Sequence, residues 1–201
     1  MRYLNVIRNI QNKNYSLKKF VFIVGLLNIL YFFIEFTVAL NIKSVSLFGD
    51  SIDFLEDASV NFLIFYALYF SLEKRVKVSI TLAIIMLFPG LATIWAVWNQ
   101  ILTQEPPDPF GLSLVGLGAL IVNCICALLL SKFKNQEGSL SLAAFLSARN
   151  DAFANILVIL TGFFIIIYPS IWPDILVGIG IAIINANAAF VVYRKAREEQ
   201  N

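Results

Sequence analysis

The chain has 201 residues, enough for one or two soluble domains, but its composition argues against a soluble protein. Hydrophobic residues make up 59% of the sequence and charged residues only 14%, whereas about 25% of residues are charged in typical soluble domains. Apolar runs that are long enough to cross a bilayer recur along the whole sequence. We therefore expect an integral, multi-pass membrane protein.

Six helical spans are predicted, each with at least the roughly 20 residues that a bilayer requires. They cover Phe20 to Ala39, Ser46 to Phe70, Val78 to Leu102, Phe110 to Leu130, Leu140 to Tyr168 and Ile171 to Tyr193. Pro89 and Gly90 lie inside the third span and should kink it, because proline removes a backbone hydrogen bond. The predicted fold class is an all-α membrane protein.

Lysine and arginine predict the orientation of these spans. Thirteen of the fifteen basic residues lie in the N-terminal tail, the Glu73 to Lys77 loop, the Lys132 to Gly138 loop and the C-terminal tail, which six spans place on one side. By the positive-inside rule, both termini are cytoplasmic. We predict a basic cytoplasmic tail over residues 1–19, a six-span domain over residues 20–193 and a short cytoplasmic tail over residues 194–201. The expected location is the inner or plasma membrane of the cell.

Seven charged residues lie at membrane depth, away from the ends of the predicted spans, where each isolated charge costs roughly 2.5 to 3.5 kcal/mol on insertion scales. They are Glu35, Asp50, Asp53, Glu56, Asp57, Arg149 and Asp151. On a helix that advances by about 100° per residue, Asp50, Asp53 and Asp57 share one face. Asn61 continues this stripe by one turn, while Glu56 is displaced to one side. The stripe predicts a polar interior between helices.

The fifth predicted span repeats the pattern of the second. DASVN, which begins at Asp57, matches DAFAN, which begins at Asp151, and each follows a serine-leucine-rich lead, SVSLF in one case and SLSLAAF in the other. Ser147, Asp151 and Asn155 form an equivalent stripe, from which Arg149 points away. Spans two and five thus look like counterparts in two three-helix halves, and transporter sites commonly lie between such repeats near mid-bilayer.

Carboxylates that meet in a medium of low dielectric constant repel one another unless protons or a cation neutralise them. Three of them, Asp53, Asp57 and Asp151, together with the hydroxyl of Ser147, would suit a divalent metal cation. Because the metal binds only carboxylates that have released their protons, exchange of protons for metal follows. The sequence therefore predicts a metal site that alternates between two occupants.

A structural interpretation is the alternative for the remaining polar groups. Arg149 could neutralise Glu56 or Glu35, leaving other acids protonated as hydrogen-bond donors, although one arginine cannot balance six acids. The residues predicted to surround the ligands or to carry protons are Asp50, Glu35, Glu56, Arg149, Asn150, Asn61 and Asn155.

The sequence resembles the transmembrane domain of the cation diffusion facilitator family, six-span exporters that exchange divalent metal for protons. SVSLFGDSIDFLED, at residues 44–57, corresponds to the family's SxSLxxD segment followed by His or Asp, three residues and Asp. Glu35 stands where the family often has a glutamate in the first span. The family's fifth span has His or Asp four residues before Asp, often with Asn four residues after it. Here these positions hold Ser147, Asp151 and Asn155.

The resemblance implies a metal site in which Ser147 is a weak neutral ligand, so that either Asn150, Asn155, Asp50 or water completes the coordination or the affinity for metal is low. The protein contains no histidine, and an all-oxygen site favours Mn²⁺, Fe²⁺ or Mg²⁺, with Co²⁺ and Zn²⁺ still open. The sequence ends eight residues after Tyr193. We therefore do not expect the cytoplasmic ferredoxin-like domain that supports dimerisation in relatives, and a homodimer stays an open alternative.

Transport of a divalent cation is the predicted function, and efflux by proton antiport is the predicted mechanism. The alternative is a non-transporting partner or sensor protein related to such exporters, which Ser147 in place of a stronger ligand would fit. An intramembrane hydrolase is disfavoured, because the sequence has no histidine, no GxSxG and no HExxH motif. We expect no enzyme activity, no resident cofactor and no nucleic-acid partner, but we expect metal cations, protons and the lipid bilayer as partners.

Overall fold

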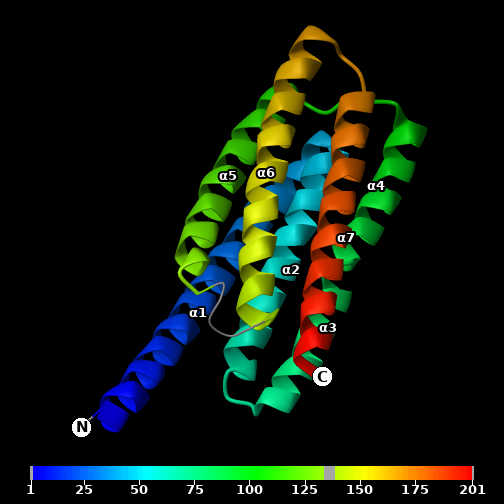
Figure 1. Cartoon of the computed structure of the whole chain (residues 1–201). Helices are drawn as coiled ribbons and strands as arrows, with labels where there is room; N and C mark the ends of the chain where they lie inside the picture. The colour runs from blue at the N-terminus through cyan, green and yellow to red at the C-terminus, as the bar shows by residue number, and fades with distance from the viewer. Residues whose placement is uncertain (1, 134–138, 201) are drawn as a thin grey trace.

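The computed structural model describes residues 2–133 and 139–200, in which the chain forms seven helices. Their bounds are Arg2–Ile42 for α1, Val45–Ala67 for α2, Leu72–Ile85 for α3, Phe88–Thr103 for α4, Pro109–Ser131 for α5, Ser139–Ile167 for α6 and Trp172–Gln200 for α7. The helices run up and down in one bundle, and both ends of the chain lie at the same end of it (Figure 1). The described residues contain no strand, so the all-α prediction is confirmed.

Five segments are long and apolar enough to cross a membrane. They are Leu17–Ile42, Glu73–Thr103, Pro109–Ser131, Ser139–Ile167 and Trp172–Glu199. The second predicted span corresponds to α2, which has 23 residues but carries four acids that interrupt its apolar run. Helices α1, α3, α4, α6 and α7 all pack against α2. A multi-pass membrane protein is thus supported, while the sixth span stays a prediction.

The third predicted span is broken rather than merely kinked. Helix α3 ends at Ile85 and α4 begins at Phe88, with a turn at Met86 and Leu87 between them. Pro89 lies in the first turn of α4, where its missing N–H does no harm, whereas within a continuous helix it would remove a bond to the preceding turn. The expected disturbance is confirmed as an interruption of the helix at Met86 and Leu87.

Helices α1 and α2 are joined by a two-residue reversal. Lys43 has a positive φ of 55°, and Ser44 caps α2 by accepting a hydrogen bond from Leu47 N at 3.1 Å. The Lys43 ammonium forms an ion pair with Glu105 in the loop between α4 and α5. The hydrogen bond that Lys43 donates to Glu105, together with the positive charge of Lys43, lowers the pKa of the exposed Glu105 carboxyl. The reversal is thereby tied to a neighbouring loop.

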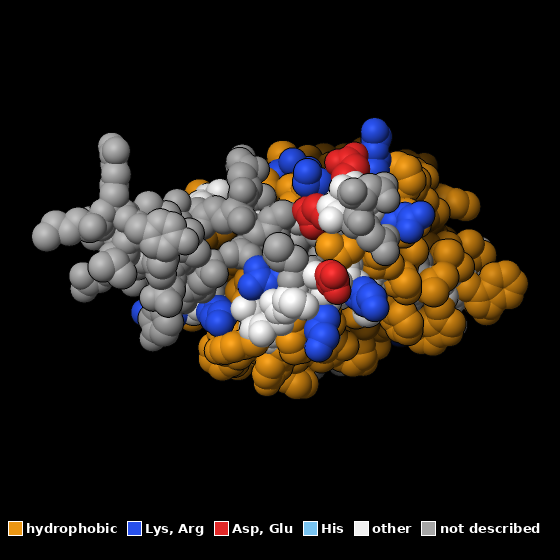
Figure 2. Space-filling model, turned by 60° about the horizontal axis from the view of Figure 1, so that its bottom comes forward, with side chains coloured by type: hydrophobic (Ala, Val, Ile, Leu, Met, Phe, Trp, Pro, Cys, Tyr) orange, Lys and Arg blue, Asp and Glu red, His pale blue; other side chains and the backbone are white. Residues whose placement is uncertain are grey.

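Charged side chains gather at the end of the bundle that carries the termini. Figure 2 views this end and shows Lys, Arg, Asp and Glu side chains there, with hydrophobic side chains on the flanks. The exposed basic residues at this end include Lys19 in α1, Lys74 and Lys77 in α3, Lys132 after α5, and Arg194, Lys195 and Arg197 in α7. Apolar flanks between polar ends are what a bilayer requires of a bundle.

Two apolar layers enclose a polar middle inside the bundle. Toward the termini, a cluster includes Leu17, Val24, Ile64 and Leu130, all at most 1% exposed. Toward the other end, a second cluster includes Ala39, Leu47, Leu112 and Ile181, again at most 1% exposed. The acidic residues of α2 lie along the chain between the residues that α2 gives to these two clusters, so packing holds them at a fixed depth.

Gly162 allows α5 and α6 to pack closely. A Cβ at this position would lie 2.8 Å from the Pro109 carbonyl oxygen and 2.0 Å from Ser113 Oγ. We predict that Gly162→Ala lowers the melting temperature of the detergent-purified protein, because overpacking costs about 1–3 kcal/mol. Gly180→Ala is the matched control, since a Cβ there meets nothing within 4 Å and alanine favours a helix. Equal melting temperatures of both variants would contradict the prediction.

Candidate carboxylate site

The acidic face of α2 points into the bundle. Asp50, Asp53, Asp57 and Asn61 are at most 1% exposed, as the helical stripe predicts. Glu56 is 7% exposed, so it is buried as well although it lies off the stripe. Burial of four carboxyl groups on one helix places a concentrated acidic surface at membrane depth.

Asp57 is the point where three helices meet. The Ser147 hydroxyl on α6 donates a hydrogen bond to Asp57 Oδ1, and Asn28 on α1 donates from Nδ2 to Asp57 Oδ2 at 3.3 Å. The buried Asp151 side chain lies near the same carboxyl group. The two predicted stripes therefore face each other, and α1 contributes a donor from a third side.

Asp53 is held by α7 instead. Asn185 donates from Nδ2 to Asp53 Oδ1 at 2.8 Å, and Asp53 Oδ2 has no partner. Among the described residues, no group of three or more His, Cys, Asp or Glu side chains is gathered closely enough to hold a metal ion. The close group thus consists of Asp57, Asp151 and Ser147. For Asp53 to join it, its side chain would have to turn from Asn185.

A second carboxyl pair lies on the side of Asp53 that faces the start of α2. Glu35 and Asp50 are fully buried, and none of their four oxygen atoms has a hydrogen-bond partner. The two carboxyl groups lie next to each other, and the charges of both act on Tyr31. Tyr31 itself donates a hydrogen bond to Val115 O at 2.7 Å. A buried carboxyl without donors must be protonated or accompanied by a cation.

The ion pair of Arg149 with Glu56 or Glu35 is not formed, so that alternative is wrong for this structure. Arg149 is exposed and donates to Asn150 Oδ1 from Nη2 at 2.9 Å and from Nε at 3.3 Å. Arg149 lies two residues from each of the inward-facing residues Ser147 and Asp151, so helical geometry points its side chain roughly opposite to theirs. Asn150, in turn, is engaged with Arg149 rather than with a carboxylate.

Two asparagines of the predicted set lie at the site in different ways. Asn61 donates to the Asp57 backbone oxygen at 2.8 Å, so it does not reach the Asp57 carboxyl group. Asn155 is fully buried, and neither atom of its amide has a partner. An unpaired amide at this depth is available to a ligand or to water.

Asn28 is the contact that sequence reasoning missed. Cys126 on α5 donates a weak hydrogen bond from Sγ to Asn28 Oδ1 at 3.7 Å, which orients the Asn28 amide nitrogen toward Asp57. The available signal was a lone asparagine seven residues before Glu35, which places both on one face of α1. Cys126 therefore belongs to the hydrogen-bond network around Asp57.

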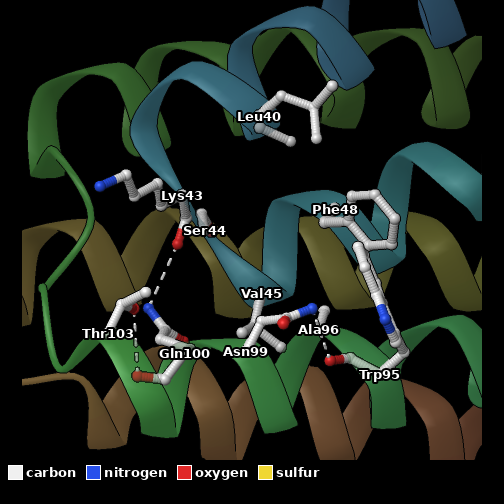
Figure 3. A pocket seen from close by; sticks show the side chains of 11 residues that line it. Leu40, Lys43, Ser44, Val45, Phe48, Trp95, Ala96, Asn99, Gln100 and Thr103 are labelled. Carbon is white, nitrogen blue, oxygen red and sulfur yellow. Dashed lines mark hydrogen bonds between the residues drawn. The ribbon is translucent and has the colours of Figure 1, made fainter.

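A separate groove of about 350 Å³ lies between the end of α1, the start of α2 and α4 (Figure 3). Leu40, Phe48 and Trp95 form its apolar side, and Gln100 donates to Lys43 O at 3.3 Å on its polar side. None of the predicted site residues lines this groove. The groove and the carboxylate site thus have no residue in common.

Comparison with known proteins identifies the family. Residues 21–199 match the cation efflux transmembrane domain, which covers all the residues of the carboxylate site. No curated protein matches the chain. The match confirms the family resemblance drawn from the α2 and α6 stripes, and the members of this family are cation transporters rather than enzymes. The chain belongs to the cation efflux family, also called the cation diffusion facilitators.

Proposed function

We propose that this protein exports a divalent metal cation in exchange for protons, at the carboxylate site between α2 and α6. The observation that supports this most is the meeting of Asp57, Ser147 and Asp151 in the buried interior. Membership of the cation efflux family supports a function in cation transport. The buried carboxylates supply a place where a cation is more stable than in the surrounding lipid.

The transported cation would be coordinated by oxygen atoms of the site residues. Asn28 and Ser147 donate to Asp57, and such donors favour the ionised carboxylate that a metal needs. On metal binding, the Ser147 oxygen would turn its lone pairs to the cation, and Asp53 would leave Asn185 to complete the set with Asp151. The absence of histidine from the sequence favours Mn²⁺, Fe²⁺ or Mg²⁺ over Zn²⁺.

Charge balance supports coupling to protons. Six carboxyl groups, from Glu35, Asp50, Asp53, Glu56, Asp57 and Asp151, are buried in the middle of the bundle. One divalent cation neutralises only two negative charges, and Arg149 points away from the cluster. Protons must therefore occupy the other carboxyl groups, and more of them when the metal leaves.

The direction of transport follows from orientation. The basic end of the bundle in Figure 2 is the end that the positive-inside rule assigns to the cytoplasm. The start of α2, the loop between α4 and α5 and the start of α7 then face the exterior. With protons more concentrated outside, their entry through the site would drive the metal outward.

Asp57→Asn should abolish transport, because it removes the negative charge while keeping the shape of the side chain. Mn²⁺ and Fe²⁺ flux into proteoliposomes under an imposed pH gradient measures the effect. Glu105→Gln, in an exposed loop, is the control and should transport at the rate of the unmodified protein. Unchanged transport by Asp57→Asn would refute the proposed site.

Metal binding should release protons and should weaken as the pH falls. Each carboxylate must lose its proton before it binds the metal, so acid favours the metal-free form. Titration of the purified protein with Mn²⁺ in weakly buffered solution with a pH indicator measures both effects. A pH-independent affinity without proton release would contradict antiport. Binding with proton release but no flux in vesicles would favour the non-transporting sensor.

Ser147→His should shift the metal preference toward Zn²⁺. An imidazole nitrogen at this position is a stronger ligand for Zn²⁺ than a hydroxyl, and we expect the Zn²⁺ to Mn²⁺ affinity ratio to rise at least about tenfold. Calorimetric titration with each metal measures the ratio. Ser59→His, on the exposed face of α2, adds the same group away from the site and should leave the ratio unchanged. Equal ratios in both variants would exclude Ser147 as a ligand.

A further inference from the structure

Asp174, in the first turn of α7, binds the N-terminus of α2. It is fully buried and accepts hydrogen bonds from Val45 N at 2.7 Å, from Ser46 N at 3.2 Å and from Ser44 Oγ at 2.9 Å, as well as from the Ser46 hydroxyl. The first turn of α2 contains no acid of its own. An anion stabilises a helix N-terminus, and here α7 supplies it to a different helix.

Glu199, in the last turn of α7, makes the equivalent contact with the N-terminus of α6. It accepts a hydrogen bond from Ser139 N at 2.7 Å and another from Ser139 Oγ at 2.6 Å. Ser139 Oγ also lies 2.8 Å from Ser79 Oγ on α3. The first turn of α6 likewise contains no acid, so again the helix depends on α7 for its anion.

These two contacts explain the serine-leucine-rich leads of the sequence. SVSL at residues 44–47 and SLSL at residues 139–142 are the first turns of the two helices that carry the carboxylate stripes. The leads lie at opposite ends of the bundle, because Asp174 and Glu199 are separated by 25 residues of α7, or about 38 Å of helix. Between them, Asn185 of α7 holds Asp53.

We propose that Asp174 and Glu199 are positioning residues of two gates, one at each end of the cation path, which open in alternation. When Asp174 releases the start of α2, the path opens at that end, and when Glu199 releases the start of α6, it opens at the other. The structure has both contacts closed, with the carboxylate site buried between them. This inference depends on the proposed transport function.

Release at either end is feasible because water can take over the hydrogen bonds. The groove of Figure 3 is lined by Ser44 and Val45, which belong to the Asp174 contact, so it offers solvent a route to the freed N–H and hydroxyl groups. Glu199 is exposed at the opposite end.

Reversible cross-links test the proposal in a background that lacks the exposed Cys124 but keeps Cys126, which is buried and contacts Asn28. Ser46→Cys with Asp174→Cys would lock one gate, and Ser139→Cys with Glu199→Cys would lock the other. The control pair, Gly116→Cys with Val158→Cys, joins α5 to α6, where a Cβ on Gly116 would lie 3.6 Å from Val158 Cβ, within the range that a disulfide requires.

Metal flux into proteoliposomes is measured before oxidation, after oxidation and after reduction, with the cross-link verified by mass. We expect each gate pair to lose transport to the level of protein-free vesicles on oxidation and to regain it on reduction, while the control pair transports throughout. Undiminished flux in either oxidised gate pair, or equal loss in the control, would overturn the proposal. Absence of flux from the unmodified protein would instead refute the proposed function, and oxidised pairs that still bind Mn²⁺ would show that the site survives.

Discussion

Burial of six carboxyl groups, with no base beside them in the part of the chain that the structure describes, is the constraint on which the rest of the structure depends. Asp53, Asp57 and Asp151 are at most 3% exposed, inside a bundle whose flanks are apolar. Such a cluster is costly in lipid, so every surrounding helix contributes to shielding it. This explains why α2, the most acidic helix, is packed by α1, α3, α4, α6 and α7 rather than exposed to the bilayer.

The donors around the cluster are neutral amides and hydroxyls rather than charged bases. Asn28, Ser147 and Asn185 each donate one hydrogen bond to a carboxylate from a different helix. Neutral donors stabilise an ionised carboxylate only moderately, whereas an arginine would fix it permanently as one half of an ion pair. The proposed exchange of metal for protons at this site requires the weaker kind of support.

The sequence was informative wherever helical periodicity decides the outcome. The i, i+3, i+7 spacing of Asp50, Asp53 and Asp57 predicts a shared face from local geometry alone, and all three are buried. What depends on packing between helices could not be predicted in this way. The hydrogen bond from Asn28 to Asp57 exists because α1 packs against α2. Arg149 points away from Glu56 because of the way α6 is rotated about its axis.

Helix boundaries and the arrangement of the proposed metal ligands also depend partly on local sequence and partly on packing between helices. The prolyl ring of Pro89 predicts a disturbance in the third span, but the complete turn at Met86 and Leu87 depends on how α3 and α4 pack against α7. Likewise, the residue types at Asp53 and Ser147 indicate a metal site, but whether their side chains converge depends on rotamers, which a sequence does not determine.

The opposite directions of α2 and α6 have an electrostatic consequence. Because their first turns lie at opposite ends of the bundle, each mouth of a path between them contains one helix N-terminus, which carries about half a positive charge. Left alone, this partial charge would repel an approaching cation from either compartment. Asp174 and Glu199 of a single helix, α7, cancel it at both mouths. One helix thus neutralises the N-termini of both helices that carry the carboxylate stripes, because α7 runs the length of the bundle between them.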